Sequence, residues 1–128
     1  MDDQQRHDDG TRTRREVLGD PHVDRSIAAT TELTADFQDF ITRVAWGDVW
    51  QRPGLDRRTR SALTIALLAA LGHHDELGMH VTGGIRNGLT PAEISEVLLQ
   101  VAVYAGVPAA NAAFRAAQAA LEPAPDGE

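Results

Sequence analysis

Helix start and stop signals follow one another along this chain, and no stretch of it shows the apolar–polar alternation that predicts a β-strand. The clearest start signal is Thr90-Pro91-Ala92-Glu93, which combines a capping box with proline at the first helical position. An apolar stripe at helical spacing follows it, formed by Ile94, Val97, Leu98, Val101, Ala102 and Ala105. The sequence therefore predicts an all-α fold.

Proline, glycine and capping residues also bound the other expected helical segments, some of them short, and we expect a domain of about six helices. A short one is expected over residues 13–19, others over 21–30, 34–49, 56–72 and 75–87, and a last one opens at Pro108. The helix at 56–72 is apolar nearly all round from Ala62 onward, which is typical of a helix in the middle of a protein. The last helix holds eight alanines between Ala109 and Ala120, which favours close packing against other helices, in this subunit or another.

Both ends of the chain differ in composition from its middle. Residues 1–13 are polar and charged without periodicity, and residues 122–128 hold two prolines, one glycine and three acids. We expect a disordered arm and a disordered tail at these two places. One helical domain is expected between them, over residues 14–121, and 128 residues suffice for a single core.

Composition excludes several classes of function. The chain has no cysteine and no lysine, so thiolate chemistry, disulfides and Schiff-base catalysis are ruled out. Its net charge of −7 argues against a nucleic-acid partner. The longest apolar run, residues 62–71, includes Thr64 and is too short to span a membrane, and the first residues lack the pattern of a signal peptide. We expect a cytoplasmic protein without a membrane partner.

The stretch from His73 to His80 contains a candidate acid–base site. On a helix, Glu76 and His80 are one turn apart, so the carboxylate can hold the imidazole or raise its pKa. A positioned imidazole is the commonest proton-transfer group in enzymes. A surface Glu–His pair is the alternative. Gly83 and Gly84, one turn further on, leave room for a small substrate or for another helix.

The first turn of the helix at 56–72 carries a second signal. Arg57, Arg58 and Arg60 stand where cations oppose the helix dipole, so something else is expected to stabilise them. A bound carboxylate is one answer, because guanidinium groups match carboxylates bidentately. The alternative is a solvated basic turn paired with Asp56 and with acids of the N-terminal arm.

Four further residues are candidates for substrate contacts. Trp46 and Trp50 are four residues apart and either wall a pocket or belong to the core or an interface. Tyr104 and Asn111 flank the turn at 106–108, where they can hydrogen-bond a ligand or the backbone at two helix ends.

A metal site is not expected. The three histidines at positions 73, 74 and 80 do not form the arrangement that marks zinc proteases, and Glu76 with His80 supplies only two ligands. The sequence also lacks a glycine-rich phosphate loop and a nucleophile elbow.

Several ordered blocks of the chain resemble the carboxymuconolactone decarboxylase family. The likeness covers roughly Arg14 to Leu121. Its blocks are Arg15-Glu16-Val17-Leu18-Gly19-Asp20, Phe37-Gln38-Asp39-Phe40-Ile41-Thr42-Arg43, Pro53-Gly54-Leu55-Asp56-Arg57-Arg58-Thr59-Arg60-Ser61, Glu76-Leu77-Gly78-Met79-His80 and Tyr104-Ala105-Gly106-Val107-Pro108-Ala109-Ala110-Asn111.

This resemblance implies an all-helical fold shared with alkylhydroperoxidase-D-like proteins and a ring-like homo-oligomer, a hexamer or trimer. It implies decarboxylation of 4-carboxymuconolactone to β-ketoadipate enol-lactone in the protocatechuate branch of aromatic catabolism, with no cofactor. Peroxidase relatives carry Cys-x-x-Cys and a following histidine. Here His73 and Glu76 stand at the cysteine positions and His80 at the histidine position, which removes peroxidase chemistry.

The implied reaction assigns roles to the candidate residues. The three arginines are candidates to bind the two carboxylates of the substrate, and His80 held by Glu76 is the candidate proton donor to carbon. Trp46 or Trp50 would place the departing carboxylate in a dry pocket. Two alternatives stay open: another lactone or dicarboxylate decarboxylase or isomerase on the same scaffold, and a non-catalytic helical assembly module.

Overall fold

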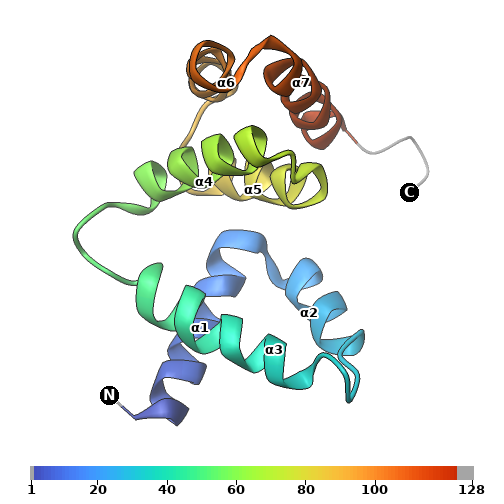
Figure 1. Ribbon diagram of the computed structural model, residues 1–128. Helices are drawn as coiled ribbons and strands as arrows, with labels where there is room; N and C mark the ends of the chain where they lie inside the picture. The colour runs from blue at the N-terminus through green and yellow to red at the C-terminus, as the bar shows by residue number, and fades with distance from the viewer. Residues whose placement is uncertain (1, 124–128) are drawn as a thin grey trace. The chain divides into compact units, whose positions relative to one another are not determined.

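A computed structural model describes residues 2–123, and every regular element in that part of the chain is a helix (Figure 1), which confirms the all-α class. The helices group into two compact units that divide between Arg57 and Arg58, and each is described by itself. The first unit holds α1 (Asp3–Leu18), α2 (Asp20–Ala28), α3 (Ala35–Ile41) and the π-helical stretch η1 (Thr42–Val49). The second holds α4 (Arg57–Leu71, whose first residue is the last of the first unit), α5 (His74–Arg86), α6 (Pro91–Ala105) and α7 (Val107–Leu121).

The N-terminal segment differs from the disordered arm that we expected over residues 1–13, because α1 already begins at Asp3. A capping box starts it: the Asp2 side chain accepts from the Gln5 backbone N–H at 2.8 Å, and the Gln5 side chain accepts from the Asp2 N–H at 3.1 Å. The helix also packs against η1. Contact with a neighbouring helix therefore orders a segment whose own composition is unfavourable for folding.

Glycines let α1 and η1 approach closely. A Cβ on Gly10 would overlap the Thr42 carbonyl oxygen, and one on Gly47 would overlap the backbone of Arg6. The two glycines are buried and face each other across the crossing, since the Gly10 Cβ position is also 2.9 Å from the Gly47 nitrogen. This crossing holds the N-terminal unit together.

The helix expected over residues 34–49 is present, but its second half is wound as a π-helix. The Trp50 N–H donates to the Ala45 carbonyl at 2.9 Å, a bond that spans five residues. Trp46 and Trp50 stack with ring centroids 5.0 Å apart, and both are buried. Short π-helical stretches are uncommon and often lie near functional sites.

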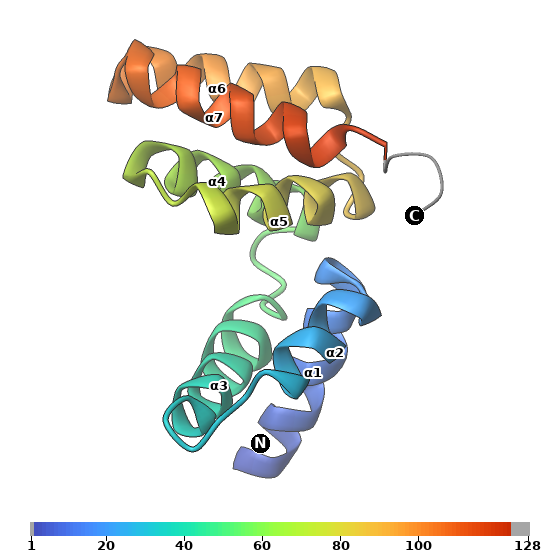
Figure 2. The ribbon, with the colours of Figure 1, turned by 90° about the vertical axis from the view of Figure 1, so that its right-hand side faces the viewer.

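The C-terminal unit is built as expected, with boundaries close to the expected ones. Thr90 and Glu93 form the capping box of α6, and Gly106 joins α6 to α7 at a φ of 104°, a left-handed conformation that favours glycine. Both α5 and α6 pack against α7 (Figure 2). The core comprises Ile65, Ala69, Leu77, Val81, Leu89, Ile94, Leu98, Val101, Ala113 and Ala117.

Two remaining expectations concern the C-terminal tail and membrane spans. Helix α7 ends at Leu121, and the expected disordered tail at 122–128 lies, except for its first two residues, outside the described part. Within residues 2–123, none of the helices combines the length and the apolar character needed to cross a membrane.

Candidate functional site

The predicted proton donor, His80, lies on the buried face of α5. Leu77, one turn earlier, and Val81, the next residue, are fully buried core residues. His80 itself is 9% exposed. An imidazole on this face is largely shielded from water by the same amphipathic pattern that builds the core. Proton transfer from such a group is protected from competing exchange with bulk water.

Glu76, the predicted partner of His80, lies one turn earlier on α5 and is exposed. Among the residues that the structure describes, it makes no hydrogen bond or ion pair. Its helical spacing still allows the carboxylate to reach the imidazole side of the helix. Pairing of Glu76 with His80 therefore stays a prediction.

The end of α5 is tied to the start of α4. The Asn87 side-chain amide donates to the Ser61 hydroxyl at 2.9 Å, and Ser61 is fully buried. A Cβ on Gly84 would lie 3.0 Å from the Leu89 side chain and 3.2 Å from that of Ile65. Of the two interpretations of Gly84, these contacts favour close helix packing over room for a substrate.

Two of the three predicted carboxylate-binding arginines already have carboxylate partners. Arg57 pairs with Glu16 in the N-terminal unit, and Arg58 pairs with Glu93 of α6 in the C-terminal unit. These pairs supply the compensation that the N-terminal turn of α4 needs. The glutamates are not the partners that the alternative interpretation named, which were Asp56 and acids of the arm at residues 1–13. Arg60 is half-buried on the same turn. A substrate at Arg57 or Arg58 has to displace a protein carboxylate.

The aromatic candidates belong to the N-terminal unit and the polar candidates to the C-terminal unit. Trp46 and Trp50 stack in the interior of the N-terminal unit, which favours the core interpretation. Tyr104 is 82% exposed near the end of α6, and Asn111 is exposed on α7. The two tryptophans are in direct contact, and the substrate contacts of Tyr104 and Asn111 stay predictions.

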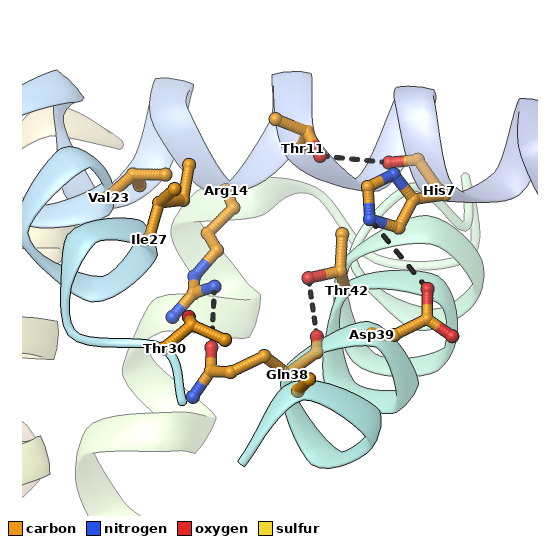
Figure 3. Close-up of a pocket in the computed structure, with 10 residues that line it drawn as sticks. His7, Thr11, Arg14, Val23, Ile27, Thr30, Gln38, Asp39 and Thr42 are labelled. Atoms are coloured by element: carbon orange, nitrogen blue, oxygen red, sulfur yellow. Dashed lines mark hydrogen bonds and ion pairs between the residues drawn. The ribbon is translucent and has the colours of Figure 1, made fainter. Parts of the chain in front are cut away.

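A pocket that the sequence pattern did not indicate lies among α1, α2, α3 and η1 (Figure 3). Its volume is about 420 Å³. Arg14 of α1 points into it and is 8% exposed, and desolvation lowers the pKa of its guanidinium from the ordinary value. Its position four residues after the buried Gly10 and three before the buried Val17 is the signal that the sequence offered. Because residues 1–13 were expected to be disordered, the helical spacing of Gly10, Arg14 and Val17 was not recognised as one buried face.

Metal ligands are not clustered in the described part of the chain. Within residues 2–123, no group of three or more histidine, aspartate or glutamate side chains could hold an ion.

The fold and the buried histidine define a small all-helical protein with a candidate acid–base residue. The model of the "Carboxymuconolactone decarboxylase family" matches residues 35–119, about two thirds of the chain. The chain therefore belongs to the carboxymuconolactone decarboxylase family.

Three relatives have names that specify a reaction. A 4-carboxymuconolactone decarboxylase of Acinetobacter baylyi is 51% identical over 92% of this chain and 88% of its own. A nitrosuccinic acid decarboxylase of Metarhizium robertsii is 46% identical over 79% of this chain and 71% of its own. A 48-residue 4-carboxymuconolactone decarboxylase sequence of Pseudomonas putida is 50% identical over its full length and 38% of this chain.

Proposed function

We propose that this chain is a carboxy-lyase that converts 4-carboxymuconolactone to β-ketoadipate enol-lactone and CO2, a step of protocatechuate catabolism. The observation that carries the proposal is the 51% identity to the Acinetobacter decarboxylase over 92% of this chain. Identity at that level extends over both units rather than over one motif.

The substrate itself can accept the electrons that the reaction releases. The bond from the lactone γ-carbon to its carboxylate breaks, and the electron pair passes through the ring double bond to the lactone carbonyl. A dienolate forms, CO2 leaves, and a proton is added to the ring α-carbon. The protein has to bind two carboxylates, stabilise the dienolate oxygen and deliver that proton.

His80 is the residue that we assign to proton delivery. Its burial on α5 supports this role, because an imidazole shielded from water can transfer a proton to carbon in a dry site. Glu76 would accept a hydrogen bond from the His80 ring nitrogen that does not deliver the proton, once substrate or a second subunit covers the exposed side of α5. All three arginines stay candidates to bind the substrate carboxylates, and at Arg57 and Arg58 the substrate would replace a glutamate partner.

The proposal includes a homo-oligomer, a hexamer or trimer as the resemblance implies. Apolar side chains form an exposed stripe along α4, where Leu63, Leu67 and Leu71 are 49%, 61% and 66% exposed at a spacing of four residues. Near the turn between α6 and α7, Val103 and Val107 are also exposed. Burying such stripes in subunit contacts stabilises an assembly through the hydrophobic effect. The cytoplasmic location stays a prediction.

The similarity to a nitrosuccinic acid decarboxylase supports a second candidate function. A nitro group beside a carboxylate can also accept the electrons of decarboxylation, so the same helical site could serve a different dicarboxylic acid. Decarboxylation of the lactone and decarboxylation of nitrosuccinate differ in the electron-accepting group, and both need a proton donor.

Turnover of the two compounds by the same preparation distinguishes the candidates. We expect kcat/KM for 4-carboxymuconolactone to exceed that for nitrosuccinate by at least about a hundredfold. The reverse order would assign the chain to the second function. Turnover of neither compound by a folded, oligomeric protein would overturn both.

A further inference from the structure

Arg14 is a buried cation without an acidic partner. Its two terminal nitrogens donate to neutral oxygens, the Gln38 side-chain carbonyl and the Ser26 hydroxyl, each at 3.3 Å, which is long for such bonds. Its Nε is buried and has no hydrogen-bond partner. The neighbouring arginines of α1 differ: the exposed Arg12 pairs with Asp9, and the half-buried Arg15 pairs with aspartates of α2. In a chain with nineteen acids, this guanidinium is left with neutral neighbours.

A buried charge without a counter-ion is costly, so an occupant that supplies one would be favoured. The pocket that Arg14 faces has a volume of about 420 Å³, within the range of small-molecule sites. Figure 3 shows Val23 and Ile27 of α2 beside the arginine and Gln38 of α3 below it. The Gln38 carbonyl accepts from Arg14, which leaves its amide N–H groups available for a second oxygen.

The acid at the other end of the pocket is already neutralised. The Asp39 carboxylate lies 3.7 Å from the His7 Nε2 and accepts from the Arg43 Nε at 2.9 Å. The charge of Arg14, in contrast, extends to His22 of α2, whose pKa is lowered by desolvation and then by the charges of Arg14 and Arg25. The Arg14 end of the pocket is therefore electropositive, and its walls beside α2 are apolar.

We propose that this pocket binds a small organic acid, with its carboxylate on the Arg14 guanidinium and the Gln38 amide and its carbon skeleton against Val23 and Ile27. Two sources share this chemistry. One is the dicarboxylate substrate, which rests on the proposed function, and the other is a separate organic acid that acts as an effector.

The first test uses adipate, an unreactive six-carbon dicarboxylate, with adipamide as its neutral counterpart, on the full chain in its native assembly. The arginine Nε–Hε signals are recorded by NMR during titration, and the Arg14 signal is assigned by its loss in Arg14→Lys. We expect adipate to shift the Arg14 signal saturably and adipamide to leave it unmoved. An unmoved Arg14 signal at saturating adipate would overturn the proposal, and the titration itself uses the unmutated chain.

The second test compares adipate affinity by calorimetry in matched variants. Arg14→Gln removes the buried cation, whereas Arg12→Gln removes an exposed one from the same helix. We expect about a tenfold or larger loss of affinity in Arg14→Gln, because a charge-assisted bond is lost, and less than about twofold in Arg12→Gln. Equal affinities in folded Arg14→Gln and wild type would assign Arg14 a purely structural role and overturn the proposal.

Kinetics with 4-carboxymuconolactone then separate the two sources. A raised KM in Arg14→Gln, together with lost adipate binding, identifies the substrate as the ligand. Lost adipate binding with unchanged kcat and KM identifies a separate acid. If the wild type binds adipate at Arg14 but does not turn the lactone over, the proposed function fails and the pocket assignment stands. If the wild type turns the lactone over and adipate leaves the Arg14 signal unmoved, the pocket assignment fails and the proposed function stands.

Discussion

Replacing Gly10 of α1 by alanine is expected to destabilise the N-terminal unit, although alanine normally stabilises the interior of a helix by about 1 kcal/mol relative to glycine. A Cβ at Gly10 would overlap the Thr42 carbonyl oxygen and lie 2.9 Å from the Gly47 nitrogen. These are backbone atoms, which cannot rotate aside, so α1 and η1 have to separate. Overpacking of this kind costs about 1–3 kcal/mol, and such direct backbone overlap belongs at the upper end.

We expect a net loss of about 2 kcal/mol in Gly10→Ala, which is the steric cost reduced by the gain in helix propensity. Gly78→Ala is the matched control, because Gly78 is inside α5 and its Cβ would meet its nearest neighbour, the Ala120 Cβ, at an ordinary 3.9 Å. That variant is expected to gain about 0.5–1 kcal/mol.

Urea unfolding at one fixed protein concentration measures both variants. The protein has two tryptophans, Trp46 and Trp50, and both lie in the N-terminal unit, so their fluorescence reports on the unit that contains Gly10. Circular dichroism follows all helices together. A Gly10→Ala protein as stable as wild type, or more stable, would refute the close crossing of α1 and η1.

The remaining predictions concern catalysis, pH and assembly. His80→Ala is expected to lower kcat by about a hundredfold or more while helical circular dichroism and assembly size are retained. His74 is exposed on the same helix, so His74→Ala should keep the normal kcat. Full activity in His80→Ala would refute the assignment of His80 as proton donor. The pKa of His22 is lowered below its ordinary 6.5 in the folded chain, so the unfolded chain takes up a proton first as the pH falls. The contribution of neutral His22 to the free energy of unfolding is therefore complete above pH 6.5 and is lost as the pH falls below it. His22→Gln should therefore flatten the decline of Tm between pH 7.5 and 5.5, and an unchanged decline would contradict this cause. Leu67→Glu on the exposed α4 stripe should shift sedimentation toward smaller species, whereas an unchanged coefficient would remove that stripe from the subunit contact.

Local signals were sufficient for the helices of the C-terminal unit. The capping box of Thr90 and Glu93 and the left-handed Gly106 act within a few residues, so the sequence states them directly. The start of α1 was missed for the opposite reason. Its order depends on packing against η1, which begins only at Thr42, as well as on the Asp2 cap.

The candidate site was predictable in part. The position of His80 on an apolar helical face follows from the periodicity of α5, and the structure buries it there. The partners of Arg57 and Arg58, Glu16 and Glu93, are distant in sequence, and no pattern within one helix identifies them. Arg14 illustrates the same limit, because its environment is formed by side chains from α2 and α3.

The most direct test of the central claim is the stoichiometry of CO2 release from 4-carboxymuconolactone by purified protein treated with a chelator and dialysed. The proposed reaction predicts one CO2 for each lactone consumed, loss of the substrate ultraviolet spectrum at the same rate, and, in deuterated water, one deuteron on the ring α-carbon of the product. Lactone consumption without CO2 would show isomerisation or hydrolysis instead. No consumption by the folded, assembled protein would contradict the account.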